Sequence, residues 1–272
     1  MALKKKRLDI LLLERGYFNS RERAKASIMA GIVSVDGRVV DKAGTMVGVD
    51  CSISLREDPV PYVGRGGLKL QKALDLFDID VSGINAIDVG ASTGGFTDCL
   101  LQRGAGKVYA IDVGYGQLDW KLRNDQRVVV MERTNIRYVK PEDIGEPCDL
   151  AVIDVAFISL TLVLDVVRTL LKPGGRIIAL IKPQFEAGRE KVGKKGIVRD
   201  PAVHREVVWK IYEFLVGMDF EVRGITYSPI TGNDGNIEYL IYADGDKGLK
   251  GTDEDMQSLI DRIIEESHRI HS

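Results

Sequence analysis

The chain has 272 residues, of which 44% are hydrophobic and 29% charged, with a formal net charge of −2 at pH 7. This composition is that of an ordinary globular protein, long enough for one large domain or for a small and a large one. No apolar run approaches the roughly 20 residues that cross a bilayer, which excludes a membrane-spanning protein.

The N-terminus places basic residues before apolar ones, as a secretory signal does. Asp9, Glu14 and Arg15 leave an uncharged segment of only residues 10–13, too short for the apolar core of a signal peptide. The three cysteines are widely spaced and fit neither a disulfide framework nor a zinc cluster. We therefore expect a cytoplasmic protein.

Charge is distributed unevenly along the chain. Residues 1–25 hold eight basic and three acidic side chains, a net charge of +5, whereas residues 251–266 are rich in acids. Such polarity predicts a face that binds a polyanion near the N-terminus, despite the negative total.

Two short helices are predicted first. The leucines of residues 8–12 share one helical face, and Gly16 ends that helix. Ser20 is the expected N-cap of a second helix over residues 21–30, which stops at Gly31.

A β-hairpin follows in GIVSVDGRVV, residues 31–40, where alternating apolar positions flank an Asp36-Gly37 dipeptide. Two helices and a hairpin with clustered basic residues resemble the S4 RNA-binding module. The resemblance is carried by RLD at 7–9, SR at 20–21, Ala24, this hairpin and Lys42. It implies RNA contacts by Lys4, Arg7, Arg21, Arg23, Lys25 and Lys42; the alternative is a solvated basic helix pair.

Pro59 and Pro61 break the chain, and residues before prolines are extended. With the glycines of residues 64–67 they predict a linker over 59–67 that joins an S4 unit, 1–58, to a second domain, 68–272. We expect the glycines to let the units swing, and Arg65 to contact RNA.

From residue 84 onwards, short β-rich runs alternate with helical or loop segments, which predicts an α/β domain with a parallel, doubly wound sheet. The last two strands, FEVRGITYS and NIEYLIYA, are joined by a turn, SPITGNDG. We therefore expect a final antiparallel hairpin.

Ligands of such sheets bind beyond the carboxyl ends of the strands. The first strand ends in IDVGASTGGF, where glycines allow a tight turn before a helix that begins near Phe96. The turn is neither GxGxxG nor a Walker A loop. Asp112 after the second strand can accept ribose hydroxyls, and Asn135 follows the third. The glycine turn alone leaves NAD as an alternative.

Together these features resemble the cofactor site of class I, Rossmann-like S-adenosylmethionine-dependent methyltransferases, which implies a seven-stranded sheet with an antiparallel final strand. The residues that the resemblance assigns to the cofactor are Asp88, Gly90, Ala91, Ser92, Gly94, Gly95, Phe96, Asp112 and Asn135. For Asp88 the alternative is an electrostatic role at the N-terminus of the next helix.

Four charged residues occupy places where catalysis is expected. Asp154 and Lys182 stand at the ends of the fourth and fifth strands, Glu238 lies in the closing hairpin, and Lys69 precedes the first strand. Methylation of a ribose 2′-hydroxyl needs a general base, because that hydroxyl is very weakly acidic. The Lys-Asp-Lys-Glu order is similar to that of FtsJ-like ribose 2′-O-methyltransferases.

Segments along nearly the whole chain resemble the TlyA family. These are the S4-like residues 1–58, VGRGGLKL at 63–70, DVGASTGGFTD at 88–98, KPQFEAGRE at 182–190 and GNDGNIEYL at 232–240. The family implies S-adenosylmethionine-dependent 2′-O-methylation of cytidine in 16S and/or 23S rRNA. We expect a monomer without a metal, in which Lys182 is the general base or orients the hydroxyl and Asp154 positions it.

Two other functions compete with this interpretation. The family's haemolysin label suggests membrane lysis, although the acid-rich polar face of the C-terminal helix favours packing on a domain. A ribosome-assembly factor that binds rRNA without catalysis is the second, and the complete set of four charged residues argues against it.

Overall fold

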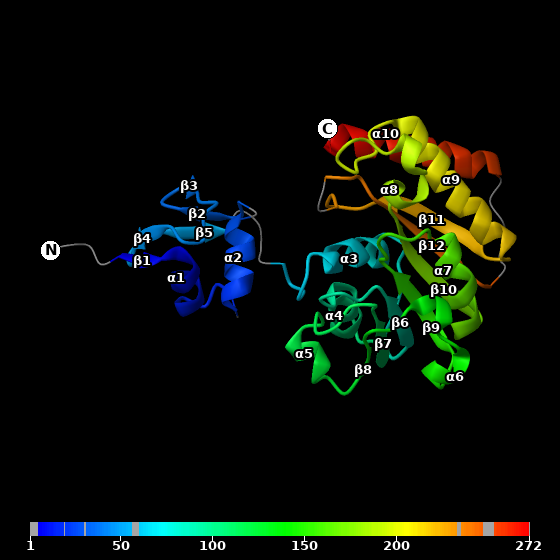
Figure 1. The fold of residues 1–272 in the computed structure, drawn as a ribbon, viewed down its shortest axis with the longest axis horizontal. Helices are drawn as coiled ribbons and strands as arrows, with labels where there is room; N and C mark the ends of the chain where they lie inside the picture. Colours follow the sequence, from blue (N-terminus) through cyan, green and yellow to red (C-terminus); the bar gives the residue numbers. More distant parts are fainter. Residues whose placement is uncertain are drawn as a thin grey trace. The chain divides into compact units, whose positions relative to one another are not determined.

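The computed structural model describes residues 5–18, 20–29, 31–55, 60–232, 235–246 and 253–271. The chain divides into two compact units, Met1–Pro61 and Tyr62–Ser272, which are coloured from blue to red along the sequence in Figure 1. Lys4, Asn233 and Asp234 lie outside the described residues.

The described residues of the first unit form two helices and two small antiparallel sheets. Strand β1 (Lys5–Arg7) pairs with β4 (Met46–Gly48), and β2 (Val33–Val35) lies between β3 (Arg38–Val39) and β5 (Ile53–Leu55). Helices α1 (Leu8–Glu14) and α2 (Arg21–Met29) pack together through buried Leu8, Leu12 and Ile28. The predicted helix-helix-hairpin order is confirmed.

Local signals explain these elements. Ser20 Oγ accepts a hydrogen bond from Arg23 N at 3.2 Å, so the predicted N-cap of α2 is present. Asp36 and Gly37 both have positive φ, 49° and 78°, as the tightest hairpin turns require. Gly31, with φ 71°, ends α2 in the left-handed conformation that favours glycine.

Residues 62–67 do not form the predicted flexible linker. Tyr62 is buried, Val63 N donates to Asp98 Oδ2 at 2.8 Å, and Gly66 opens helix α3 (Gly66–Leu76). A Cβ on Gly67 would lie 2.3 Å from the Tyr62 ring. The glycines therefore allow close packing within the second unit, to which residues 62–67 belong, rather than forming a flexible segment.

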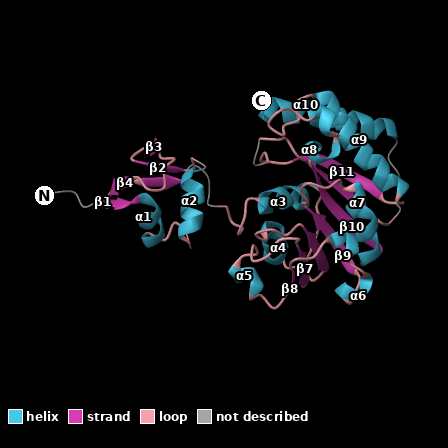
Figure 2. Cartoon of the chain, in the orientation of Figure 1, coloured by secondary structure: helices cyan, strands magenta, loops and turns pink. Residues whose placement is uncertain are grey.

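The second unit is built on a seven-stranded sheet in the order β11-β12-β10-β9-β6-β7-β8, drawn in magenta in Figure 2. The neighbours from β10 to β8 pair in parallel, whereas β12 is antiparallel to both β10 and β11. The predicted parallel sheet and antiparallel final strand are confirmed. The strands are β6 (Asn85–Val89), β7 (Lys107–Ile111), β8 (Val128–Met131), β9 (Cys148–Ile153), β10 (Leu171–Ile181), β11 (Glu221–Tyr227) and β12 (Tyr239–Asp244).

Helices cover both faces of this sheet (Figure 1). They are α3, α4 (Gly95–Gln102), α5 (Trp120–Arg123), α6 (Pro141–Ile144), α7 (Thr161–Leu170), α8 (Pro183–Glu186), α9 (Pro201–Gly217) and α10 (Asp253–His271), with short 3-10 helices η1 (Ile136–Tyr138) and η2 (Arg189–Lys191). Alternation along β6 sends Ile87 and Val89 into the core with α7 and α9, while Asp88 between them faces α4.

The C-terminal helix, α10, is packed on the domain. Its residues Ile260, Ile263 and Ile264 are buried in the core that α9 and β11 also form. The apolar face that a lytic helix would need is therefore covered. Among the described residues, no helix combines the length and apolar character of a membrane span.

Candidate active site

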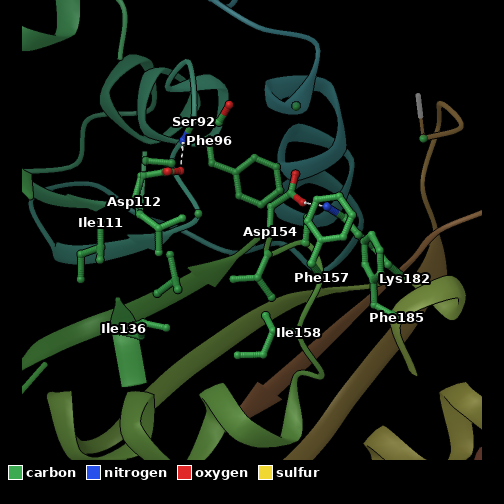
Figure 3. A pocket seen from close by; sticks show the side chains of 18 of the residues that line it. Ser92, Phe96, Ile111, Asp112, Ile136, Asp154, Phe157, Ile158, Lys182 and Phe185 are labelled. Atoms are coloured by element: carbon green, nitrogen blue, oxygen red, sulfur yellow. Dashed lines mark hydrogen bonds and ion pairs between the residues drawn. The ribbon is translucent and has the colours of Figure 1, made fainter. Parts of the chain in front are cut away.

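A cavity of about 1390 Å³ opens where β6, β7, β9 and β10 end, the edge at which parallel α/β sheets bind ligands. Its wall includes the turn after β6, the residues that follow β7 and β9, and the start of α8. Figure 3 shows side chains from these segments turned toward one another.

The turn after β6 needs glycine for two reasons. Gly90 has φ 85°, and a Cβ there would lie 2.3 Å from the backbone oxygen of Asp154. Gly94 has φ 97° and precedes α4 as its N-cap, in contact with Leu122. The backbone can thus pass close to the neighbouring strand and turn directly into a helix.

Asp112 stands at the rim of this turn, one residue beyond β7. Its carboxylate accepts hydrogen bonds from Ser92 N at 2.8 Å and from Gly114 N at 2.7 Å, and the first is drawn in Figure 3. These two bonds hold the carboxylate in place but leave lone pairs for a ligand in the cavity. Asn135 also lines the cavity, and its side chain accepts from Arg137 N at 3.1 Å.

Of the nine predicted cofactor residues, seven line the cavity, and Asp88 and Gly94 do not. Asp88 is fully buried, and its Oδ2 accepts from Thr97 N at 2.9 Å and from Thr97 Oγ1 at 2.6 Å. It therefore holds the first turn of α4, the alternative role considered for it. Burial raises the pKa of its carboxyl to about 7.

The four predicted catalytic residues meet at one side of the cavity. Lys182 Nζ lies 2.5 Å from Asp154 Oδ1. Lys69 Nζ donates to Glu238 Oε2 at 2.6 Å and lies 3.9 Å from Asp154 Oδ2. Asp154 thus stands between two lysines that are 113 positions apart in the sequence, Lys69 and Lys182.

The side chains of this cluster are almost fully buried. The side chains of Lys69, Lys182 and Glu238 are 10%, 13% and 3% exposed, and that of Asp154 is 20% exposed. Burial raises the pKa of Glu238 above its ordinary value, and the neighbouring Lys69 opposes that rise. Two lysines and two acids thus lie together in a low-dielectric site, where charge interactions are strong.

The loop after β9 supplies residues that the sequence did not single out. Phe157 is 91% exposed, has φ 63°, and its ring lies 5.0 Å from that of Phe185. Both rings line the cavity, as Figure 3 shows. An aromatic residue three positions beyond a predicted catalytic aspartate was the available signal.

The carboxylate of Glu186 anchors this loop through hydrogen bonds. Its carboxylate accepts from Leu160 N and from Ser159 Oγ, both at 2.6 Å, and the side chain is 2% exposed. Lys210 Nζ lies 3.4 Å from the same carboxylate. One buried acid therefore ties the β9 loop to α8.

The predicted RNA-binding residues differ in surroundings. Arg7 and Arg21 both bind the buried carboxylate of Asp9, at 3.0 Å and 2.9 Å, and these bonds lower the pKa of Asp9 to about 2. Lys42 is exposed, Arg23 and Lys25 are half-buried, and Arg65 lines the cavity of the second unit.

Comparison with known proteins places this geometry in a family. The FtsJ-like methyltransferase model matches residues 62–244, and the S4 domain model matches residues 6–50. A Mycobacterium tuberculosis protein named 16S/23S rRNA (cytidine-2′-O)-methyltransferase TlyA is 44% identical, over 87% of this chain and 88% of its own. The chain belongs to the TlyA family of FtsJ-like methyltransferases.

Solved structures agree with this membership. A Streptococcus thermophilus protein that carries a hemolysin name is 44% identical, with a TM-score of 0.77, over 98% of this chain and 97% of its own. A Listeria monocytogenes protein described as an S-adenosylmethionine-dependent methyltransferase shares the fold over 68% of this chain and 100% of its own, at 17% identity and a TM-score of 0.51. The predicted family and fold class are confirmed.

Proposed function

We propose that this TlyA-family member methylates the ribose 2′-hydroxyl of cytidine in 16S and/or 23S rRNA and takes the methyl group from S-adenosylmethionine. The proposal depends on one observation: the Lys69–Glu238 and Asp154–Lys182 pairs form a nearly buried cluster beside the glycine turn. Methylation of a base nitrogen would not need such a cluster, whereas a weakly acidic hydroxyl does. The choice of cytidine and of rRNA rests on the named relative.

The residues around the cavity fit the proposed cofactor. Asp112 keeps acceptor capacity for ribose hydroxyls, and the glycine turn offers backbone at close range. Ile136 and Phe96 supply apolar walls suited to an adenine ring and the methylene groups of the methionine chain. S-adenosylmethionine would supply an electrophilic methyl group on a sulfonium centre.

Lys182 is the proposed base. Asp154 Oδ1 lies 2.5 Å from its amine, so the carboxylate keeps the amine at this side of the cavity. In its neutral form Lys182 accepts the proton of the 2′-hydroxyl, and the oxygen gains the electron pair that it needs for alkylation. Productive attack needs the oxygen roughly 3–3.5 Å from the methyl carbon.

Lys69 and Glu238 are proposed to complete the site. The Lys69 amine donates to Glu238 and lies 3.9 Å from Asp154 Oδ2, whereas Lys182 lies against Oδ1 of the same carboxylate. Phe157 and Phe185 offer an aromatic surface at the mouth of the cavity on which an extruded base can stack. The basic residues of the S4 unit, with Arg65, are proposed to bind rRNA phosphates.

The test is a methyl-transfer assay with purified protein, isotopically labelled S-adenosylmethionine and intact ribosomal subunits. The proposal expects label in 2′-O-methylcytidine after digestion of the rRNA to nucleosides. Label only on a base, or no transfer by a protein that binds the cofactor in calorimetric titration, contradicts it. The second result would favour a non-catalytic assembly factor, and leakage of liposomes by the protein would favour a lytic function.

A further inference from the structure

A second concentration of positive charge lies beside the cavity, in the segment that joins α8 to α9 (Figure 1). Residues 189–200 contain five basic and two acidic side chains, a net charge of +3 in a chain whose total is −2. We call residues 191–199 the basic loop. Its basic side chains line a hollow of about 380 Å³, separate from the main cavity.

Three of the four basic side chains of this loop are available for a ligand. Lys191 pairs with Glu206 at 2.5 Å, and Asp200 is engaged as the N-cap of α9, where it accepts from Ala202 N at 2.9 Å. Within the ranges that the structure describes, Lys194, Lys195 and Arg199 form no ion pair. All three are exposed.

Buried side chains hold the loop in one conformation. Asn236 is 1% exposed; its Oδ1 accepts from Val198 N at 3.0 Å, and its Nδ2 donates to Gly196 O at 2.9 Å. His204 is also fully buried, and its Nε2 donates to Val198 O at 2.9 Å. A loop fixed by its backbone loses little conformational freedom when its side chains bind a partner.

The anchor connects the loop to the proposed active site. Asn236 lies two positions before Glu238, and Arg189, two positions before Lys191, lines the main cavity. The loop therefore follows one wall of the cavity along the chain, through Arg189, and is hydrogen-bonded to the segment that carries Glu238. This places the loop next to the cluster, within reach of a polymer whose ribose enters the cavity.

We propose that Lys194, Lys195 and Arg199 form a docking site for the phosphate backbone of the substrate RNA next to the methylated nucleotide. This inference rests on the proposed function and adds a catalytic-domain contact to those of the S4 unit. The hollow is lined by lysine and arginine and by no aromatic residue, a composition that favours contacts with phosphates over contacts with bases. Phosphate contacts position an RNA, whereas contacts with base edges read its sequence. We expect the site to affect RNA affinity and not the chemical step.

The test compares wild type with the double variants K194A/K195A and K194E/K195E on intact ribosomal subunits and on protein-free rRNA. The alanine variant should raise KM for both forms of RNA about 10-fold and leave kcat within about 2-fold, and charge reversal should raise KM further. The slope of log affinity against log salt should fall by about 0.7–0.9 for each phosphate contact that is lost. A merely structural role would not change that slope.

The control is K107A/K172A, which removes the same charge from the starts of β7 and β10, at the opposite edge of the sheet. It should leave KM unchanged. Unchanged KM and salt slope in K194E/K195E, with wild type active, would overturn the inference. A KM that rises only with intact subunits would also overturn it, because the loop would then contact a ribosomal protein. Failure of the proposed function is distinct, since wild type itself would transfer no methyl group.

Discussion

The amine of Lys182 lies 2.5 Å from Asp154 Oδ1, and no other cationic side chain approaches that oxygen among the described residues. The other oxygen of the same carboxylate faces Lys69 at 3.9 Å. Asp154 can therefore hold one lysine closely while a second, more distant one balances its charge. This asymmetry suggests different tasks for the two lysines.

Replacement of Lys182 by methionine should reduce kcat for methyl transfer about 100- to 10,000-fold, the range that a general base contributes. Methionine retains the apolar stem, so cofactor binding should change less than about 3-fold. Single-turnover methylation and calorimetric titration with S-adenosylmethionine measure the two quantities. Turnover at the wild-type rate would refute the role of Lys182.

The Lys69–Glu238 pair gives a stability prediction. Both side chains are almost fully buried, and E238A leaves the Lys69 amine with only the more distant Asp154 as a partner. We therefore expect E238A to lower the free energy of unfolding by about 3–5 kcal/mol. The double variant K69M/E238M should recover most of that stability but not the activity. Urea unfolding of the three proteins checks this; equal losses in the single and double variants would exclude a coupled pair.

Asp88 predicts a pH dependence of stability. Its pKa is raised from 3.8 to about 7, so between these values the folded state binds more protons than the unfolded one. The contribution of Asp88 to stability is thus complete below pH 3.8 and is lost as pH rises through about 7. Melting temperatures of wild type and D88N should diverge from pH 5 to pH 8 in favour of D88N. Parallel curves would show that Asp88 is ionised throughout.

Asp9 gives a test in which charge and geometry predict opposite results. D9N removes a negative charge from the RNA-binding unit, so charge alone predicts tighter RNA binding. Because Asp9 orients Arg7 and Arg21, we expect weaker binding instead, by about 3- to 10-fold if roughly 1 kcal/mol of orientation is lost. E14Q, which removes an equal charge from an exposed pair with Lys6, is the control and should not weaken binding. Filter binding to rRNA at fixed salt compares the two variants.

Glu186 is expected to position the loop that carries Phe157. E186A leaves Leu160 N and Ser159 Oγ without their buried acceptor, at a cost of about 1–3 kcal/mol in unfolding free energy. The same change should raise KM for RNA. E186Q retains an acceptor for Leu160 N and should recover most of both losses. Equal KM values in E186A and wild type would restrict Glu186 to a structural role.

The strand-end positions of Asp154 and Lys182 could be predicted because apolar runs mark where strands stop, and parallel strands end at one edge of a sheet. Asp88 was assigned to the cofactor although it lies inside a strand, between two residues of the core. Alternation turns its side chain toward α4 and away from the edge, which the strand pattern already implied.

Other features depend on packing between distant segments, which one sequence does not reveal. The glycines of residues 64–67 suggested flexibility, but they are required because α4 approaches them closely: a Cβ on Gly95 would lie 2.9 Å from Gly67 N. The Phe157–Phe185 pair and the Glu186 contacts likewise join segments on either side of α7 and β10. Their partners could be recognised only in the folded chain.

The place of β12 in the sheet has a consequence for the time at which the enzyme becomes competent during biosynthesis. Glu238 immediately precedes β12, and β12 inserts between β10 and β11, which are both made before it. A nascent polypeptide that lacks this segment would possess the glycine turn after β6 but only three of the four charged residues of the cluster. Competence therefore awaits the synthesis and insertion of β12, after both neighbouring strands have been made.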